Sequence, residues 1–354
     1  MMDIGSVLKE EKAEIERHIE EFFQEEKGES LHDPLITNVL DSIREYTLRD
    51  AKRVRSILAV MGFRAVGGKD LEKARRASIS LEMIQSMLLI HDDIIDRSHT
   101  RRGLPSFHRL YEMLHREMGY RGEPGHFGRN MAIIAGDLAE SFGEKALLRS
   151  GFPRERIFDA LMCQTEMIRD TGYGQVFDLY SVELPEWTEE MVLKVHTYKT
   201  ARYTLDSPLR IGALLHGATE EQLSALSGYA VPVGIAFQLI DDILGFFGDP
   251  KRGGPSDLSD LKEGKRTLLI IKALERADPD QKERLVRSLG NEDLTVEEAE
   301  WIRSLIGETG SERYSREIAL EKTAEGISSL ENGDLDPWVV RFLKGFAEYL
   351  VSRA

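Results

Sequence analysis

Three acidic residues close the apolar stretch LLIHDDIID at residues 88–96. On a helix, Asp92 and Asp96 would share one face, about 6 Å apart along the axis, with Asp93 beside them. Clustered carboxylates repel one another, so such a cluster is stable only if a positive charge sits among them. This donor set favours Mg²⁺, which proteins usually bind through one or two carboxylates together with phosphate oxygens and water. The stretch lacks the alternating acids, central Gly and distal Glu of a calcium-binding EF-hand loop.

A second acid pair repeats this arrangement, because Asp241 and Asp242 follow the apolar residues FQLI. The repetition predicts two helices that face each other and present acids to one cavity. The histidines show no metal-ligand spacing, and the sequence contains no Ser/His/Asp or Cys/His nucleophile arrangement and no Rossmann glycine pattern. One acid cluster alone would more often be a solvated helix end. Two clusters indicate several Mg²⁺ ions that hold a diphosphate.

Basic residues lie near both acid clusters and offer hydrogen-bond donors to an anion. Arginine in particular binds phosphate through a bidentate fork. Lys52 and Arg55 are three residues apart and would share a helical face. Each cation by itself is most simply a solvated surface residue, but together they indicate two anionic substrates, one bound through metal and one bound directly. The other members of the set are Arg101, Arg102, Lys199, Lys262, Lys265 and Arg266.

The elements that must position these residues are helices. Apolar residues recur mostly at helical spacing, and the sustained alternation that marks strands is hard to find. Capping-box patterns that join Thr219 to Gln222 and Thr295 to Glu298 mark two helix starts. The fold class is therefore nearly all-α, a bundle of many helices. The clearest helical segments are IERHIEEFF, LEMIQSMLLI, MAIIAGDLAESFGEKALL, IFDALMCQTEMI, LSALSGYAVPVGIAFQLIDDIL and VVRFLKGFAEYLV.

A single domain is expected to span residues 1–354, because no linker is long or biased enough to separate two domains. An N-terminal helix is expected at residues 1–30 and C-terminal helices at residues 280–354. Polar segments rich in Gly and Pro predict loops at residues 119–130, 182–188 and 248–266.

The composition is that of a soluble globular protein, with 41% hydrophobic and 31% charged residues. The net charge of −15 disfavours a general nucleic-acid binder, which needs a basic face. The single cysteine, Cys163, excludes an intrachain disulfide framework, favours a cytoplasmic location and is expected to be a small buried residue. The N-terminal segment is too charged for a signal peptide. The longest apolar stretches fall short of the roughly 18 residues that a membrane span needs, so no transmembrane segment is expected.

The motifs resemble those of the trans-isoprenyl diphosphate synthases, or polyprenyl synthetases, and especially the archaeal type of geranylgeranyl diphosphate synthase. DDIID followed by RRG looks like the first aspartate-rich motif of that family, and FQLIDDILGFFGD with SDLKEGKRT looks like the second. The segments GD at 136–137, GQVFD at 174–178 and KTARYTLDSPLRIGALLHGA from Lys199 fill the positions between them. The resemblance runs from about Lys52 to Leu269 and rests on the number, order and spacing of the motifs.

The resemblance implies an all-α isoprenoid-synthase bundle around a deep central cavity, usually in a homodimer. It also implies two or three Mg²⁺ ions per active site, which clamp an allylic diphosphate. The implied metal ligands are Asp92, Asp93, Asp96, Asp241 and Asp242, and the implied catalytic residues are Asp92, Asp93, Asp96, Lys199 and Asp241. The residues implied to bind the allylic substrate are Arg101, Lys199, Thr200, Gln238 and Lys265, with Gln175 nearby, and those implied to hold isopentenyl diphosphate are Lys52, Arg55, Gln85 and Arg102.

The implied reaction is a Mg²⁺-dependent head-to-tail (1′-4) condensation of isopentenyl diphosphate with dimethylallyl, geranyl or farnesyl diphosphate. The allylic C–O bond ionises while metal and basic groups stabilise the departing diphosphate. The isopentenyl double bond then attacks the allylic cation, and a proton is lost to the released diphosphate. A dry apolar cavity protects the cation from water.

Three segments depart from the family pattern. DAKRVRS replaces the usual GGKRxRP, so the glycines and the proline are gone, although the charges of Lys52, Arg53 and Arg55 remain. Gly245 stands where the second motif often has a third aspartate. RGGPS lacks the usual lysine, which Lys251 or Arg252 could replace.

In the resembling family, product length depends on the residues just before the first motif, here Ile84, Met87 and Leu88, which form the floor of the product cavity. No aromatic residue stands at the fifth position upstream, and Met87 is flexible and of middling size. The expected product is therefore the twenty-carbon geranylgeranyl diphosphate, with twenty-five or more carbons, or the fifteen-carbon farnesyl product, as alternatives. Other functions compatible with acid-rich helices are head-to-head condensation, terpene cyclisation, membrane prenyl transfer and a non-catalytic subunit of a heteromeric synthase.

Overall fold

Helices form almost all of the regular structure, as the sequence predicts. The computed structural model describes residues 2–29, 32–184, 186–247 and 259–353, and within them the all-α expectation is confirmed. The exception in these ranges is an antiparallel hairpin, in which β1 (Thr100–Arg101) pairs with β2 (Leu104–Pro105). Strands of two residues are too short to produce the alternating pattern that reveals a strand in a sequence.

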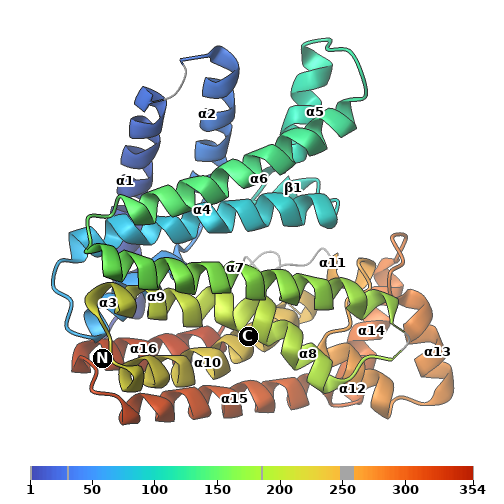
Figure 1. The fold of residues 1–354 in the computed structure, drawn as a ribbon. Helices are drawn as coiled ribbons and strands as arrows, with labels where there is room; N and C mark the ends of the chain where they lie inside the picture. Colours follow the sequence, from blue (N-terminus) through green and yellow to red (C-terminus); the bar gives the residue numbers. More distant parts are fainter. Residues whose placement is uncertain (1, 30–31, 185, 248–258, 354) are drawn as a thin grey trace. The chain divides into compact units, whose positions relative to one another are not determined.

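The chain divides into two compact units, whose elements are drawn in Figure 1. Apart from the two N-terminal methionines, unit 1 comprises Asp3–Met162 and Ile211–Gly217, and unit 2 comprises Cys163–Arg210 and Ala218–Ala354. The expectation of a single domain stays a prediction. Residues of α7 (Arg154–Glu183) and of α9 (Ser207–His216) fall in both units. The other helices of unit 1 are α1 (Ile4–Glu29), α2 (Pro34–Leu48), α3 (Val54–Ala65), α4 (Leu71–Ile95), α5 (Phe107–Glu117) and α6 (Pro124–Leu148). The other elements of unit 2 are α8 (Glu189–Val195), η1 (His196–Asp206), α10 (Glu220–Phe247), α11 (Ser259–Lys262), α12 (Leu268–Arg276), α13 (Pro279–Ser288), α14 (Val296–Glu308), α15 (Ser311–Ser329), η3 (Leu330–Asn332) and α16 (Pro337–Val351).

In unit 1, α4 and α6 lie side by side (Figure 1). Glycines on α6 bring the two helices close together. A Cβ atom on Gly136 would lie 2.1 Å from Nε2 of His91, and one on Gly143 would lie 2.8 Å from Cδ1 of Ile84. Contacts this short have no room in a close-packed interior, so both positions favour glycine. The packing fixes the helix that ends in the first acid motif.

In unit 2, η1 is a π-helical segment that packs closely against α7 and α10. A Cβ atom on Gly174 of α7 would lie 2.4 Å from the backbone nitrogen of Lys199, and one on Gly234 of α10 would lie 2.5 Å from Cα of Ala201. The π-helix is rare and is frequently found at functional sites. The helical periodicity of the sequence predicts a helix here but does not distinguish the π form from the α form.

The loop expected at residues 119–130 is wrong in its second half, because α6 begins at Pro124. Glu123 caps this helix by accepting a hydrogen bond from the backbone N–H of Gly125 at 2.8 Å. Proline at the first position of a helix is common, since its missing N–H would have no partner there. Both predicted capping boxes are confirmed by reciprocal hydrogen bonds. Most of the predicted loop at 248–266 lies outside the described residues.

Among the described helices, α10 has the length and mean hydropathy that a membrane span would need. This differs from the expectation drawn from uninterrupted apolar stretches, because Gln238 and the acid pair interrupt an otherwise apolar helix. Of the most apolar 18-residue window, 61% is buried inside the protein. A buried core helix passes the same test, so α10 is weak evidence for a membrane span.

Candidate active site

The first acid motif ends α4, where Asp92 and Asp96 keep partly exposed side chains. Asp96 is the residue that ends the helix, and its backbone N–H donates to the carbonyl of Asp92 at 2.8 Å. The Asp92 side chain is 23% exposed, whereas that of Asp93 is fully buried. Adjacent residues on a helix point about 100° apart, so the paired aspartates face different environments.

Asp93 lies in the interior and is bonded through both of its oxygens. Nε of Arg101 donates to Oδ1 at 2.8 Å, and the hydroxyl of Tyr46 donates to Oδ2 at 2.7 Å. Burial lowers the pKa of Arg101, but the hydrogen bond and charge of Asp93 outweigh that effect and raise it overall. Burial, followed by the charge of Asp93, raises the pKa of the Tyr46 phenol. Asp93 therefore differs from its two neighbours, although the sequence grouped all three as metal ligands.

Asp92 and Asp96 fit a magnesium ion in the type and spacing of their oxygens, which are hard donors one helical turn apart. In the part of the chain that the structure describes, no three acidic, histidine or cysteine side chains are close enough to form a metal centre by themselves. An ion bound at this end of α4 would complete its coordination shell with diphosphate oxygens and water, which is the usual arrangement for Mg²⁺.

The RRG segment forms the turn of the β1–β2 hairpin. Arg102 and Gly103 are its two central residues and have φ values of 55° and 76°. Positive φ at both central residues defines a type I′ turn, which usually carries Asn or Gly at the position of Arg102. The Arg102 side chain donates from Nη1 to the carbonyl of Arg49 at 3.2 Å, and burial lowers the pKa of its guanidinium. The two adjacent arginines thus have different partners, since Arg101 bonds to the Asp93 carboxylate and Arg102 to the Arg49 carbonyl.

The segment DAKRVRS contains the start of α3, at Val54. The structure places Lys52 at the surface, Arg55 half-buried, and Arg53 between them with only 2% of its surface exposed. The expected partner Gln85 lies half-buried on α4. A further residue, not expected from the sequence, is Glu82, a buried acid on α4 that pairs with Arg53. The sequence does contain a signal for this residue, because Glu82 is a lone acid inside an apolar helical stretch and a buried charge requires a partner.

In unit 2, Lys199 and Thr200 lie on η1 and bond to α7 and α10 respectively. Nζ of Lys199 is 2.5 Å from Oδ2 of Asp178. The hydroxyl of Thr200 donates to Oε1 of Gln238 at 2.8 Å, and the Gln238 amide donates to Oδ1 of Asp242 at 2.8 Å. Gln175, which was expected nearby, is half-buried on α7.

The second acid pair repeats the division seen in the first. Asp242 is buried, and its Oδ2 lies 3.2 Å from Nε2 of the buried His196. Asp241 keeps 37% of its side chain exposed and accepts a hydrogen bond from Arg353 at 2.8 Å. In both motifs, therefore, the first aspartate reaches the surface and the second is held inside.

The remaining expected binders lie beyond α10. Lys265 is half-buried, with its Nζ 2.6 Å from Oε2 of Glu263. The neighbouring Arg266 donates to the carbonyl of Leu184 at 2.7 Å. Lys251 and Arg252 lie outside the described residues.

The residues expected to form the product floor all lie on α4. Ile84 and Met87 are buried, at 0% and 4% exposure, and Leu88 is half-buried. The Ile84 side chain packs against Gly143 of α6, as described above. Of the three residues, Ile84 thus has an identified contact that fixes its direction.

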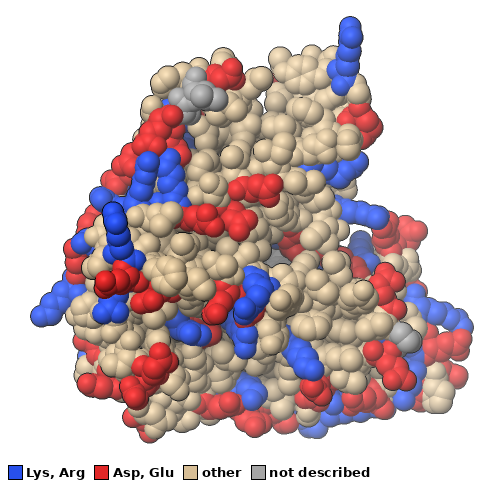
Figure 2. All heavy atoms as spheres, in the orientation of Figure 1, with Lys and Arg blue, Asp and Glu red and all other residues tan. Residues whose placement is uncertain are grey.

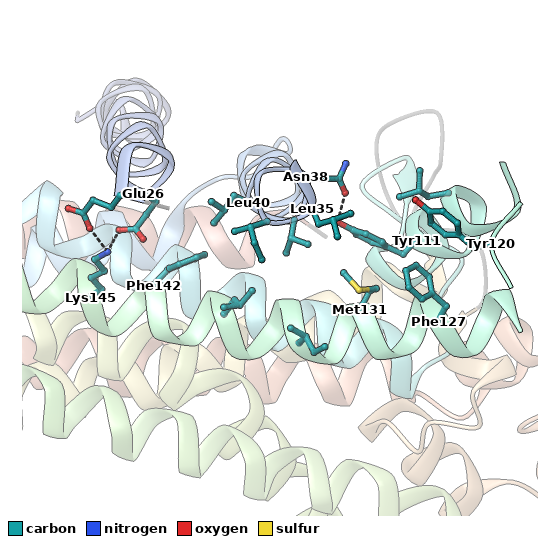
Figure 3. A pocket seen from close by; sticks show the side chains of 16 residues that line it. Glu26, Leu35, Asn38, Leu40, Tyr111, Tyr120, Phe127, Met131, Phe142 and Lys145 are labelled. Atoms are coloured by element: carbon teal, nitrogen blue, oxygen red, sulfur yellow. Dashed lines mark hydrogen bonds and ion pairs between the residues drawn. The ribbon is translucent and has the colours of Figure 1, made fainter. Parts of the chain in front are cut away.

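Unit 1 also contains an apolar groove of about 830 Å³, which we call the α6 groove (Figure 3). Residues of α1, α2, α5, α6 and the α5–α6 connection line it, so no single stretch of sequence announces it. Tyr111, Tyr120 and Phe127 stand near one end. At the other end, Nζ of Lys145 is 2.5 Å from Oε1 of Glu26.

The chain is similar to known enzymes over most of its length. A family model described as Polyprenyl synthetase matches residues 37–306. A short chain isoprenyl diphosphate synthase from Methanothermobacter thermautotrophicus is 32% identical, covering 94% of this chain and 95% of its own. A geranylgeranyl diphosphate synthase from Saccharolobus solfataricus is 30% identical over 85% and 86%, and a geranylfarnesyl diphosphate synthase from Aeropyrum pernix is 29% identical over 85% and 90%.

A solved structure agrees with the fold. Geranylgeranyl pyrophosphate synthase from Corynebacterium glutamicum, complexed with isoprenyl diphosphate and magnesium, superposes with a TM-score of 0.91 at 32% identity over 100% of both chains. These relatives are named for different product lengths but share the same class of reaction. The chain therefore belongs to the polyprenyl synthetase family and is a trans-prenyltransferase.

Proposed function

We propose that this protein condenses isopentenyl diphosphate with an allylic diphosphate, in the presence of Mg²⁺, to give geranylgeranyl diphosphate. The observation that carries the proposal is that each acid pair, on α4 and on α10, keeps its first aspartate at the surface and buries its second. A helix built in this way offers one exposed carboxylate to a metal, while the neighbouring buried carboxylate orients a polar side chain, Arg101 in the first pair and Gln238 in the second. The magnesium and isoprenyl diphosphate named for the Corynebacterium enzyme fit this arrangement.

We assign Asp92, Asp96 and Asp241 as the Mg²⁺ ligands. Asp93 and Asp242, which the sequence placed in the same set, have partners inside the protein, so their proposed role is to orient Arg101 and Gln238. The bound ions would supply positive charge to the departing diphosphate.

The basic residues of the chain would divide between the two substrates. Arg101, fixed by Asp93, and Lys199, fixed by Asp178, would donate to the allylic diphosphate together with Lys265. Charge that builds on the departing diphosphate is stabilised best by donors that are already in place. Thr200 and Gln238, which are hydrogen-bonded to each other, would present oxygen atoms to the allylic cation.

Isopentenyl diphosphate would bind to Lys52, Arg55, Gln85 and Arg102, which all belong to unit 1. Its double bond would attack the cation, and the released diphosphate would take the proton. No side chain with a raised basicity is needed for that last step, because the diphosphate is itself a base beside the reacting carbon.

The twenty-carbon product is favoured by the residues ahead of the first motif. Met87 and Ile84 are aliphatic and buried, so they close the space less completely than aromatic side chains would. The geranylfarnesyl name of the Aeropyrum relative makes a twenty-five-carbon product the second candidate.

We also propose that the enzyme is a cytoplasmic homodimer. Ile133 and Ile134 of α6 have about half of their surface exposed, and Ile134 lines the α6 groove. Figure 2 shows both uncharged and acidic side chains over this helix. On α7, Tyr173, Val176 and Tyr180 are exposed as well. Exposed apolar rows of this kind mark protein–protein contacts in many proteins.

The test is product analysis with purified protein, Mg²⁺, labelled isopentenyl diphosphate and each allylic primer in turn. A twenty-carbon main product is expected with every primer, and a fifteen-carbon main product would refute the assignment. Failure to consume isopentenyl diphosphate would refute the condensation itself. Light scattering of the same sample should give the mass of a dimer, and Ile134→Glu should shift it towards the monomer.

A further inference from the structure

A buried ion pair joins two segments that carry residues proposed to bind isopentenyl diphosphate, since Arg53 follows Lys52 and Glu82 lies on α4 one turn before Gln85. Arg53 and Glu82 have 2% and 1% of their surface exposed, and Nη1 of Arg53 is 3.1 Å from Oε2 of Glu82. Ser56 donates to the other Glu82 oxygen at 3.0 Å. The proposed function gives neither Arg53 nor Glu82 a role, since neither side chain reaches the surface.

Arg53 also bonds to the end of α2 and to α1. Its Nη1 donates to the carbonyl of Thr47 at 2.7 Å, and its Nη2 donates to the carbonyl of Arg49 at 3.0 Å. Its Nε donates to Oε1 of Glu16 at 3.0 Å. The last carbonyls of a helix carry partial negative charge and lack partners within the helix, so a guanidinium there satisfies them. One side chain thus connects α1, α2 and α4.

The backbone of Arg53 adopts a conformation that side chains other than glycine rarely take. Its φ of 54° and ψ of 29° lie in the left-handed region, and its carbonyl accepts the first hydrogen bond of α3, from the N–H of Ile57. Strained residues of this kind persist where surrounding contacts fix them, and they cluster at ligand clamps. The conformation of Arg53 therefore sets where α3 begins, and with it the directions of Lys52 and Arg55.

Stability alone does not account for the pair. Two charges taken out of water lose hydration, and replacing a buried ion pair with apolar residues is often neutral or stabilising. Glu82 and the less buried Glu16 both provide negative charge in this cation-rich region. Glu82 also lies one turn before Gln85 on α4, so it joins the backbone of the Lys52–Arg55 segment to the helix that carries the third binder.

We propose that Arg53 and Glu82 are positioning residues for isopentenyl diphosphate, which hold Lys52, Arg55, Gln85 and Arg102 in one rigid arrangement. Arg102 is part of it because it donates to the carbonyl of Arg49, the group that Arg53 also binds. This role rests on the proposed function, since it assumes that these four residues bind that substrate.

The test is the double variant Arg53→Met/Glu82→Met, which removes both charges and keeps the volume roughly filled. The KM for isopentenyl diphosphate should rise about tenfold or more, because small displacements of binding groups cost large factors. The KM for the allylic substrate should change by less than about twofold, because the side chains of Arg101 and Lys199 are held by Asp93 and Asp178, which the double variant leaves in place. The matched control is Arg75→Met/Glu11→Met, which removes a mostly buried ion pair between α4 and α1, with side chains 19% and 12% exposed and an N···O distance of 2.8 Å, and which should change neither constant.

Glu82→Gln serves as the second variant, for the case in which the double variant does not fold. It keeps hydrogen-bonding atoms but removes the charge of Glu82 and leaves Glu16 as the carboxylate partner of Arg53, and it should also raise the KM for isopentenyl diphosphate alone. An unchanged or lowered KM for that substrate, or an equal rise for both substrates, would overturn the positioning role. If wild-type protein makes no product, the proposed function fails. The pair is then judged by calorimetry with inorganic pyrophosphate, which should bind the wild-type protein more tightly than the double variant.

Discussion

Replacing Asp93 by Asn should lower the free energy of unfolding and leave the Mg²⁺ concentration for half-maximal activity unchanged. Arg101 and Asp93 have opposite charges roughly 4 Å apart between their centres, which corresponds to about 4 kcal/mol at the effective dielectric constant of a protein. Asn keeps hydrogen-bonding atoms for Arg101 and Tyr46, and the Arg101 side chain is still 27% exposed, so part of that energy is retained or screened. We expect a loss of about 2–3 kcal/mol in the free energy of unfolding.

Urea denaturation followed by circular dichroism measures this loss, with Tyr46→Phe as the graded control. Tyr46→Phe removes one hydrogen bond to a buried carboxylate, keeps the Arg101 contact and should cost about 1–2 kcal/mol. The magnesium concentration for half-maximal activity should rise in Asp92→Asn but not in Asp93→Asn. If Asp93→Asn raised that concentration as much as Asp92→Asn and kept full stability, Asp93 would be a metal ligand and the reasoning from its burial would be wrong.

Three further predictions follow from single buried residues. Met87→Ala should lengthen the product seen by chromatography, since Met87 is expected to form the floor of the product cavity; an unchanged product would place the floor elsewhere. Burial raises the pKa of Cys163 to about 12, so iodoacetamide at pH 8 should modify it only after unfolding, as read by mass spectrometry, and rapid labelling of native protein would contradict its burial. Burial also raises the pKa of Asp206, so its folded form holds a proton more tightly than the unfolded chain does, and its contribution to stability falls as pH rises through the raised value. Asp206→Asn keeps an oxygen for the Ser227 hydroxyl and should therefore gain stability relative to wild type as the pH rises above the ordinary carboxyl pKa of 3.8 in urea denaturation, whereas a difference that does not change with pH would contradict the shift.

Much of the fold was predictable from the sequence, because helices leave a local signature. The apolar spacing around LEMIQSMLLI and the capping boxes at Thr219 and Thr295 depend on residues within a few positions of one another, and the helices and caps appear as expected. The prediction failed at Pro124, where residues typical of a loop begin a helix instead. It also missed the β1–β2 hairpin, whose Arg102 adopts a positive φ that its residue type disfavours.

The candidate site likewise has features that were predictable from the sequence and features that were not. The type of chemistry was predictable from local patterns in the sequence, which are acids in pairs after apolar segments and cations near them in an otherwise acidic chain. It could not determine which aspartate of each pair faces inward, because that depends on which side of the helix distant segments cover. Tyr46 and Arg101 reach Asp93 from 47 and 8 residues away, and Arg53 reaches Glu82 across 29. Only tertiary packing brings such groups together. The cost of burying an unpaired charge explains why each buried acid is paired with a hydrogen-bond donor or a cation.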